Sequence, residues 1–569
     1  MSDKPRLKVV LCWHMHQPFY RDLISGEYQL PWTYLHAIKD YVDMVAHLEA
    51  VPGARAVFNF APTLLEQIAD YAEQVQGSLK DSTPIRDPLL AQLDKPVLPA
   101  GVDARLTLIR HCLRANRLRL IDRFPPYRRL ADMAGWLEQN PESMMYVGEQ
   151  FLADILVWYH LAWLGETVRR EDIRVQKLMD KGSGYTLHDR RVLLEIIGEL
   201  LSGVIERYRI LAERGQIELS VTPYAHPIIP LLLDMHSAKE AWPDVSLPLL
   251  AQYPAGAERT RWHIQEGLNT FRRFFGFTPT GCWPSEGSVS DATLKLLEES
   301  GFRWAASGES VLGNSVAQTA ALHGLPREQY LYRPYRRDKG KLATFFRDDG
   351  LSDLIGFAYA SWHADDAVSN FIHNLENIAR ACHDRPDSVV SIVLDGENAW
   401  EYYPENGYYF LRALYERLAA HPGIELTTFS DCLVEPEKMA MLPHVVAGSW
   451  VYGTFSTWIG DPDKNRAWDM LGDAKRAFDR ALDSGRLNDK QLVVAERQMA
   501  ICEGSDWFWW FGDYNPATTV SDFERLFRLQ LANLYQLIGT EPPEYLSQVF
   551  AHGCGAPAAG GVMRAGKKE

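Results

Sequence analysis

A short run of strand residues that ends abruptly in acidic side chains constrains the fold of this chain more than any other feature. Residues 389–394 read Val-Val-Ser-Ile-Val-Leu, and five of the six are aliphatic types that fill both faces of a parallel sheet covered by helices. Asp395, Glu397, Asn398 and Glu401 follow. Because α/β barrels and doubly wound sheets carry their active-site loops at the carboxyl ends of strands, the pattern predicts an α/β fold with a polar site here.

Taken alone, this stretch also fits a surface turn at Asp395-Gly396 followed by a solvated helix start. A second stretch of the same design favours the site. Thr280-Gly-Cys-Trp283-Pro-Ser-Glu286 places Glu286 beside Trp283 at the end of another expected strand. Two isolated carboxylates with aromatic neighbours are what glycoside hydrolysis requires, so Glu286 and Asp395 are candidate catalytic residues.

The order of expected elements predicts a parallel sheet that is closed or nearly closed. Helix-like segments separate most of the expected strands. These strands are 7–13, 54–60, 215–223, 280–283, 303–307, 354–359, 389–394 and 424–428.

Two stretches depart from this alternation. Residues 81–215 have helical periodicity with proline-rich breaks, and we expect them to form a helical insertion over the rim of a catalytic barrel that spans residues 1–435. Residues 436–550 are expected to form a second, helical domain. The stretch 551–569 is rich in glycine and alanine, and we expect it to be disordered.

Charge and cysteine usage exclude some functions. The formal net charge of −15 argues against nucleic acid as a partner, since phosphate binding needs a positive surface. The seven cysteines are scattered and contain no Cys-x-x-Cys pair, which predicts reduced thiols and a cytoplasmic protein. No apolar run reaches the roughly 20 residues that span a bilayer, and no signal-peptide core precedes the first strand.

Three further motifs allow more than one interpretation. His14 and His16 are two residues apart at the end of the first strand and could bind a metal, recognise sugar hydroxyls, or be ordinary loop residues; no third metal ligand stands out. Glu218 could orient a histidine, bind a hydroxyl, or be a structural hydrogen-bond partner. The aromatic run 507–510 could line acceptor sites for sugar or form a packing core between domains.

Four of these motifs resemble, in order and spacing, the signature regions of glycoside hydrolase family 57. They are His14-Met-His16-Gln17-Pro18, Gly215-Gln-Ile-Glu218, Trp283-Pro-Ser-Glu286 and Leu394-Asp395-Gly-Glu397-Asn-Ala-Trp400. The resemblance implies an incomplete seven-stranded (β/α) barrel followed by an α-helical domain. It also implies action on α-glucans with retention of configuration, with Glu286 as nucleophile and Asp395 as general acid/base.

The resemblance extends to substrate contacts. Gly448-Ser-Trp450 and Gly504-Ser-Asp506-Trp507 look like glucan-binding positions of the family, and Arg347 resembles a substrate-contacting arginine of its branching enzymes. No cofactor or metal is expected. The residues expected to contact the glucan are His14, His16, Gln17, Glu218, Trp283, Arg347, Glu397, Trp400, Trp450, Trp458, Asp506 and Trp507.

Within the family the motifs look most like the α-amylase and amylopullulanase group, which implies hydrolysis of starch, glycogen or maltooligosaccharides. Transfer to a sugar, as in a 4-α-glucanotransferase or a branching enzyme, is the alternative on the same site. Two other classes stay open: a metal-dependent enzyme of the polysaccharide deacetylase type that uses His14 and His16, and a glucan-binding protein without turnover.

Overall fold

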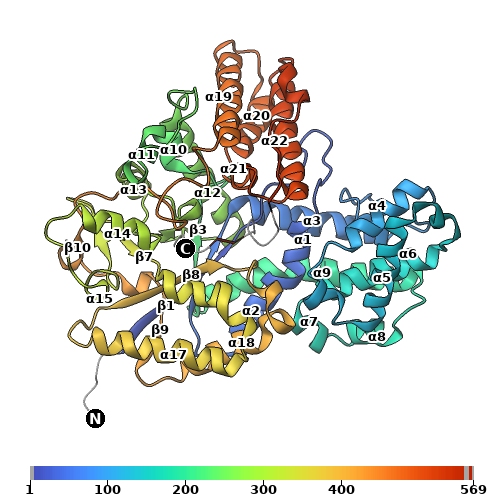
Figure 1. Ribbon diagram of the computed structural model, residues 1–569, viewed down its shortest axis with the longest axis horizontal. Helices are drawn as coiled ribbons and strands as arrows, with labels where there is room; N and C mark the ends of the chain where they lie inside the picture. The colour runs from blue at the N-terminus through green and yellow to red at the C-terminus, as the bar shows by residue number, and fades with distance from the viewer. Residues whose placement is uncertain (1–5, 556–562, 565, 567–569) are drawn as a thin grey trace.

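A computed structural model describes residues 6–555, 563, 564 and 566 and contains one curled, mostly parallel β-sheet (Figure 1). Consecutive pairs in the series β1-β2-β3-β4-β5-β7 are parallel, and β1 also pairs in parallel with β8. The described strands are β1 Leu7–Met15, β2 Ala56–Phe60, β3 Ile217–Val221, β4 Gly281–Cys282, β5 Trp304–Ser307, β6 Tyr335–Arg336, β7 Ala343–Phe346, β8 Val389–Asp395, β9 Ile424–Leu426 and β10 Ala440–Met441.

The ring of strands closes through a single bridge. β7 and β8 meet only where Arg347 faces Ser391 in a parallel bridge, and the Asp348 N–H donates to the Ser391 carbonyl at 2.8 Å. The remaining strands extend the sheet outside this ring: β6 and β10 continue from β7, and β9 pairs with the start of β1. The predicted incomplete seven-stranded barrel is therefore confirmed.

Alternation along the strands decides which side chains reach the site. On β1, Val10 and Cys12 join a buried cluster contributed by strands from around the ring, whereas Leu11 and Trp13 pack outward against the helices. Because side chains alternate along a strand, His14 faces inward at the carboxyl end of β1. The same alternation on β8 turns Val393 inward, and Asp395 two residues later lies on the same side.

One strand prediction is wrong. Residues 354–359 are not a strand: they continue helix α16 as a wider helical turn, Leu354–Ala358. Asp348 caps the start of α16, where its side chain accepts from the Leu351 N–H at 2.9 Å. The helix has therefore already begun before residue 354, and the apolar run continues it. The strand at this place in the ring is β7, which the sequence reading missed.

Helices surround the ring and form two further groups (Figure 1). Helices α4 to α9 of the insertion lie to one side of the barrel, and α19 to α22 form a separate layer above it. The described helices are α1 Trp32–His36, α2 Val42–Ala50, α3 Pro62–Asp81, α4 Val102–Cys112, α5 Pro125–Gln139, α6 Glu149–Trp163, α7 Glu166–Glu171, α8 Ile173–Lys181, α9 Leu187–Glu213, α10 Ile229–Leu233, α11 Ala238–Ala241, α12 Gly256–Phe275, α13 Asp291–Glu299, α14 Glu309–Ala317, α15 Arg327–Tyr330, α16 Asp349–Asp353, α17 Ala364–Ala381, α18 Tyr408–Ala419, α19 Pro462–Asp483, α20 Asp489–Cys502, α21 Asp506–Trp510 and α22 Ala517–Leu537.

A buried ionic network fixes the C-terminal helices to the barrel. Glu503, directly after α20, accepts hydrogen bonds from Arg259 and His263 of α12 and from the Tyr253 hydroxyl at 2.7 to 3.0 Å. These groups are almost fully buried, so removing one partner would leave an unpaired charge. The network sets the position of Asp506, which follows three residues later.

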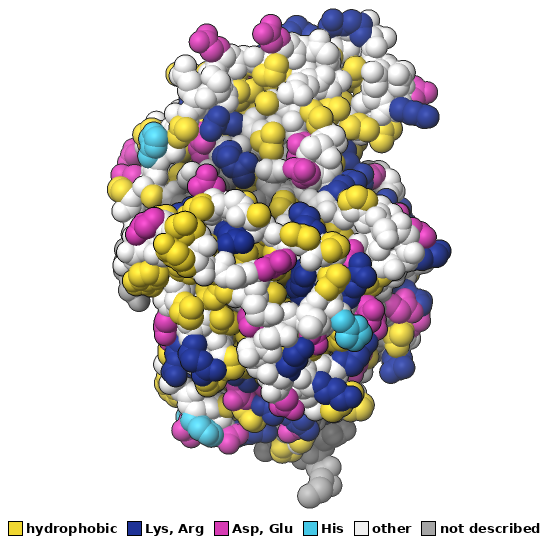
Figure 2. Space-filling model, turned by 90° about the vertical axis from the view of Figure 1, so that its right-hand side faces the viewer, with side chains coloured by type: hydrophobic (Ala, Val, Ile, Leu, Met, Phe, Trp, Pro, Cys, Tyr) yellow, Lys and Arg dark blue, Asp and Glu magenta, His cyan; other side chains and the backbone are white. Residues whose placement is uncertain are grey.

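Surface and termini add three observations. Acidic and basic side chains are interspersed on the face that Figure 2 shows. Of the helices in the described ranges, none is both long and apolar enough to cross a membrane. Of the stretch 551–569 that was expected to be disordered, residues 551–555, 563, 564 and 566 are placed and make contacts, while the others lie outside the described residues.

Candidate active site

A cleft of about 810 Å³ lies at the carboxyl ends of the barrel strands. Its lining comes from three parts of the chain: the loops after the strands, the helical insertion, and the C-terminal region. The barrel contributes both candidate catalytic carboxyl groups, the insertion contributes residues 113–116 and Trp163, and the C-terminal region contributes Trp450, Asp506, Trp509 and Trp510. A volume of this size accommodates several sugar rings.

Glu286 is held in place through both its backbone and its side chain. It follows β4 in a left-handed conformation with φ 59° and ψ 24°, which costs a non-glycine residue about 1–3 kcal/mol. The Trp450 N–H donates to the Glu286 carbonyl at 3.0 Å, and the Trp450 indole Nε1–H donates to Oε2 at 2.9 Å. Burial raises the pKa of Glu286 to about 8, and the charge of Asp395 adds to this rise.

Asp395, the last residue of β8, lines the same cleft. Its Oδ2 accepts from the Asn398 side-chain amide at 2.9 Å. Burial raises the pKa of this carboxyl as well. Two buried carboxyl groups that repel each other's charge bind one proton between them over a range of pH, so one group can be ionised while the other carries a proton.

Glu397 is a third buried acid in the cleft. Its Oε1 accepts long contacts of 3.4 Å from the His16 N–H and the Gln17 amide, and its Oε2 is buried without a hydrogen-bond partner among the described residues. Burial raises the pKa of Glu397 well above its ordinary value, with the charges of Asp395 and Asp40 adding to the effect. A protonated Glu397 would donate a hydrogen bond to a sugar hydroxyl.

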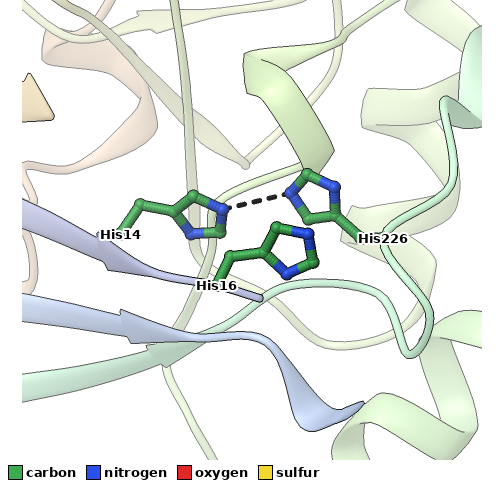
Figure 3. Close-up of side chains that lie close together, drawn as sticks. All are labelled: His14, His16 and His226. Carbon is green, nitrogen blue, oxygen red and sulfur yellow. Dashed lines mark hydrogen bonds between the residues drawn. The ribbon is translucent and has the colours of Figure 1, made fainter. Parts of the chain in front are cut away.

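Three histidine rings lie together (Figure 3). His14 comes from the end of β1, His16 from the loop after it, and His226 from the loop after β3. The nearest ring nitrogens of His14 and His226 are 3.1 Å apart, and the His16 ring stacks on the His226 ring with centroids at 3.8 Å. His226 Nδ1 lies 3.8 Å from Glu286 Oε1.

Hydrogen bonds fix the tautomers of two of these rings. Asn59 Oδ1 can only accept, so His14 Nδ1 donates to it at 2.7 Å and His14 Nε2 is an acceptor. His226 Nε2 therefore donates to His14, and His226 Nδ1 accepts from the Ser505 hydroxyl at 2.8 Å. Burial lowers the pKa of His14 to about 3 and that of His226 well below its ordinary value, and neighbouring histidine charge adds to both shifts. Both rings are neutral at pH 7.

The orientation of the rings does not suit a metal ion. One nitrogen from each of the three rings lies within 4.8 Å of the others, which is close enough for a shared ligand. A nitrogen lone pair lies in the plane of its ring, however, and these rings are nearly parallel, with interplanar angles of 13° to 17°. Stacked parallel rings do not direct three lone pairs to one point, as a tetrahedral site needs.

Several predicted contact residues do line the cleft. His16 Nε2 pairs with Asp506 Oδ1 at 2.7 Å, which joins the barrel to α21. The Arg347 guanidinium lies 5.5 Å from the Trp450 ring centroid. Its nitrogens donate hydrogen bonds to the Val393 carbonyl and to the carboxylates of Asp349 and Asp353. The predicted residues found in the lining are His14, His16, Gln17, Glu286, Arg347, Asp395, Glu397, Trp450 and Asp506.

Glu218, which was predicted to contact the glucan, does not line the cleft. It is the second residue of β3 and therefore sits near the amino end of the barrel, away from the cleft. Its carboxylate accepts from the Trp304 indole at 2.7 Å and from the N–H and hydroxyl of Ser430 at 2.9 and 2.5 Å. Of the alternatives left open, the structural hydrogen-bond partner fits this geometry.

Four predicted tryptophans are packing residues and do not line the cleft. Trp283, Trp400, Trp458 and Trp507 are each at most 1 % exposed. Trp283 packs edge-on against Trp450 at 5.1 Å, and the Trp400 and Trp507 indoles donate to the carbonyls of Gly396 and Ile501. Large rings next to polar motifs can therefore support a site from beneath it without touching substrate.

The sequence reading also missed residues that do line the cleft. Within the aromatic run, Trp509 and Trp510 at the end of α21 line the cleft, whereas Trp507 packs against Phe527 of α22. Others carry no motif that marks them: Tyr20, Trp32, His36, Trp163, Phe357, Tyr402, Phe523 and Arg564.

The chain belongs to glycosyl hydrolase family 57, whose family model matches residues 10–443. A 4-alpha-glucanotransferase of Thermococcus litoralis is 26 % identical over 266 residues, which is 45 % of this chain and 34 % of that protein. An alpha-amylase of Pyrococcus furiosus is 24 % identical over 264 residues, with the same coverage. The match thus spans about a third of the length of these relatives.

Solved structures show the same fold across nearly the whole chain. A GH57-type branching enzyme of Pyrococcus horikoshii superposes with a TM-score of 0.55 at 16 % identity and covers 95 % of this chain and 93 % of its own. The alpha-amylase AmyC of Thermotoga maritima gives a TM-score of 0.54 at 14 % identity and covers 94 % and 97 %. The barrel with its helical C-terminal region is therefore the fold of the family.

Proposed function

We propose that this chain cleaves α-glucosidic bonds in α-glucans with retention of configuration. The observation that supports this most is that β4 and β8 deliver two carboxyl groups to one cleft, near enough for the charge of Asp395 to raise the pKa of Glu286. Retaining glycosidases use a pair of carboxyl groups about 5–5.5 Å apart. Membership of the family and the names of the relatives are consistent with an α-glucan substrate.

The surroundings of the two acids suit different roles. Glu286 attacks the anomeric carbon, and the indole N–H of Trp450 stabilises its ionised form. In the free protein the raised pKa of Glu286 favours the shared proton on Glu286, so this proton moves to Asp395 for the reaction. Asp395 then gives it to the leaving oxygen and removes a proton from the incoming acceptor when the glycosyl-enzyme breaks down. The neutral histidines and Glu397 bind the sugar hydroxyls beside the bond.

Water is the proposed acceptor, which makes the enzyme an α-amylase-like or amylopullulanase-like hydrolase. A second candidate is transfer to a sugar hydroxyl. Phe357 and Tyr402 favour it, because both line the cleft and are still 46 % and 45 % exposed. Aromatic rings presented in this way can stack on an acceptor sugar.

Product analysis tests both candidates. Wild-type protein, Glu286→Gln and Asp395→Asn are incubated with maltoheptaose, soluble starch and pullulan, and chain lengths are followed by chromatography. Hydrolysis gives only products shorter than maltoheptaose, whereas transfer gives longer ones as well. The proposed roles fail if both variants keep wild-type rates, and a glucan-binding protein without turnover is indicated if the wild-type protein binds these sugars unchanged.

A further inference from the structure

Residues far beyond the C-terminal helices return to the cleft. Met563 and Arg564 line the same cavity as Glu286 and Asp395. The sequence motifs do not mark this stretch, which lies in a segment of glycine, alanine and valine. Specific contacts of Arg564 and Gly566 hold this stretch at the cleft.

The Arg564 side chain packs against two aromatic rings at the cleft. Its guanidinium lies 4.5 Å from the Trp509 ring centroid and 5.1 Å from that of Tyr514. Nη1 donates to the Thr457 hydroxyl at 3.1 Å, and Nη2 donates to the Trp509 carbonyl at 3.3 Å. Stacking and hydrogen bonds together hold both the guanidinium and the Trp509 indole in one orientation.

Gly566 anchors the stretch on the other side. Its N–H donates to Asp353 Oδ2 at 3.0 Å, and its carbonyl accepts from the Tyr452 N–H at 3.0 Å. A Cβ at this position would lie 2.5 Å from Asp349 Cγ, so only glycine fits. Asp349 and Asp353 both pair with Arg347, which contacts the Trp450 ring that holds Glu286.

We propose that Arg564 is a specificity-determining residue of the glucan cleft. It presents the Trp509 ring to the sugar and donates hydrogen bonds to sugar hydroxyls from the wall beside Glu286. This inference rests on the proposed function, that the cleft binds an α-glucan. The charge of Arg564 also acts on Glu286. Burial raises the pKa of Glu286, and the positive charge of Arg564 is among the contributions that oppose this rise.

Two variants perturb the stretch independently. Arg564→Ala removes the side chain, and Gly566→Val unseats the backbone through the clash with Asp349. Arg466→Ala is the matched control, because Arg466 stacks on Tyr545 at 5.0 Å and does not line the cleft. We expect KM for maltoheptaose to rise about tenfold in both test variants, with kcat within about threefold of wild type, as lost charged hydrogen bonds predict. The control keeps wild-type KM.

A pH profile separates this role from a structural one. Removing a cation next to the carboxyl pair raises the pKa of the pair, so the alkaline limb of kcat/KM moves to higher pH in Arg564→Ala and stays in place in the control. Unchanged KM and an unchanged limb in both test variants, with an active wild type, would overturn the inference. A gain in kcat/KM would also overturn it, since the stretch would then occupy space that the glucan needs.

Calorimetry keeps the inference testable if the proposed function fails. Should the wild-type protein turn over no glucan, maltoheptaose binding is measured directly. An affinity about tenfold lower in Arg564→Ala than in wild type supports the proposed contact between Arg564 and the glucan. Equal affinities, or no binding to the wild-type protein, overturn it.

Discussion

At the level of single residues, the shared proton of Glu286 and Asp395 controls the chemistry. Burial raises the pKa of both carboxyl groups, and it raises that of Glu286 to about 8, with the charge of Asp395 as the next largest contribution. The pair therefore carries one proton below about pH 8 and loses it above that value. In the proposed mechanism the productive form has this proton on Asp395 and the charge on Glu286, which is the reverse of the distribution that the raised pKa of Glu286 favours in the free protein.

This titration predicts a pH dependence with a definite sign. We expect kcat/KM of the wild-type enzyme to fall as pH rises through about 8, because no acid is then left for the leaving oxygen. In Asp395→Asn, assayed with an aryl maltoside whose phenol leaves without a proton, this alkaline limb disappears. Glu286 then ionises at a lower pH than in wild type, since the neighbouring negative charge is gone. A variant that keeps the wild-type alkaline limb would contradict the assignment.

Trp450 gives a second prediction at this scale. Trp450→Phe keeps a ring against Trp283 but removes the N–H that donates to Glu286 Oε2. A hydrogen bond to a charged group contributes about 1.5–3 kcal/mol, so kcat/KM should fall about 10- to 150-fold. Trp362→Phe, at a tryptophan that is 44 % exposed and outside the cleft, is the control and should leave kcat/KM unchanged. Equal effects of the two changes would show that the indole N–H has no role.

At the level of elements, Arg347 holds the open seam between β7 and β8. Its Nε donates to the Val393 carbonyl of β8 at 2.8 Å, and its other nitrogens pair with Asp349 and Asp353 of α16. One bridge is the only strand pairing at this seam in the described chain, and the hydrogen bond from the guanidinium to Val393 adds a further link across it. The residue predicted to contact substrate thus also closes the barrel.

The seam predicts a loss of stability. Arg347→Met leaves the buried Asp349 without its partner, and we expect the free energy of unfolding to fall by about 3 kcal/mol. Urea unfolding measures this as a lower midpoint with an unchanged slope. Arg412→Met is the control, because Arg412 pairs with Glu416 while both side chains are 49 % exposed, and such pairs contribute less than about 1 kcal/mol. Equal midpoints for the two variants would rule out this role.

Elements also show what the sequence could and could not predict. β1 and β8 were predictable because an apolar run turns polar at His14 and Asp395, and alternation then fixes the inward side. β7 was missed because Ala-Thr-Phe-Phe is too short to stand out, while the longer apolar run at 354–359 belongs to a helix that Asp348 starts. Burial of Trp283, Trp400, Trp458 and Trp507 depends on tertiary packing, which a motif does not report.

At the level of the whole molecule, the cleft exists only because three distant parts of the chain meet. The barrel provides Glu286 and Asp395, the insertion provides residues 113–116, and the C-terminal region provides Asp506 and Trp509. Sequence motifs predicted the barrel contribution well. They could not predict that residues 113–116 and Arg564 line the cleft, because the fold alone brings these residues there.

Labelling of the nucleophile tests the central claim most directly. The enzyme is incubated with a fluorinated maltosyl fluoride, whose electron-withdrawing group slows breakdown of the glycosyl-enzyme, and is then digested and sequenced by mass spectrometry. The account predicts one maltosyl-derived label, on the peptide that contains Glu286, which is absent in Glu286→Gln. A label on Asp395 or on another residue would contradict the proposed roles, and so would rapid turnover to a product of inverted configuration.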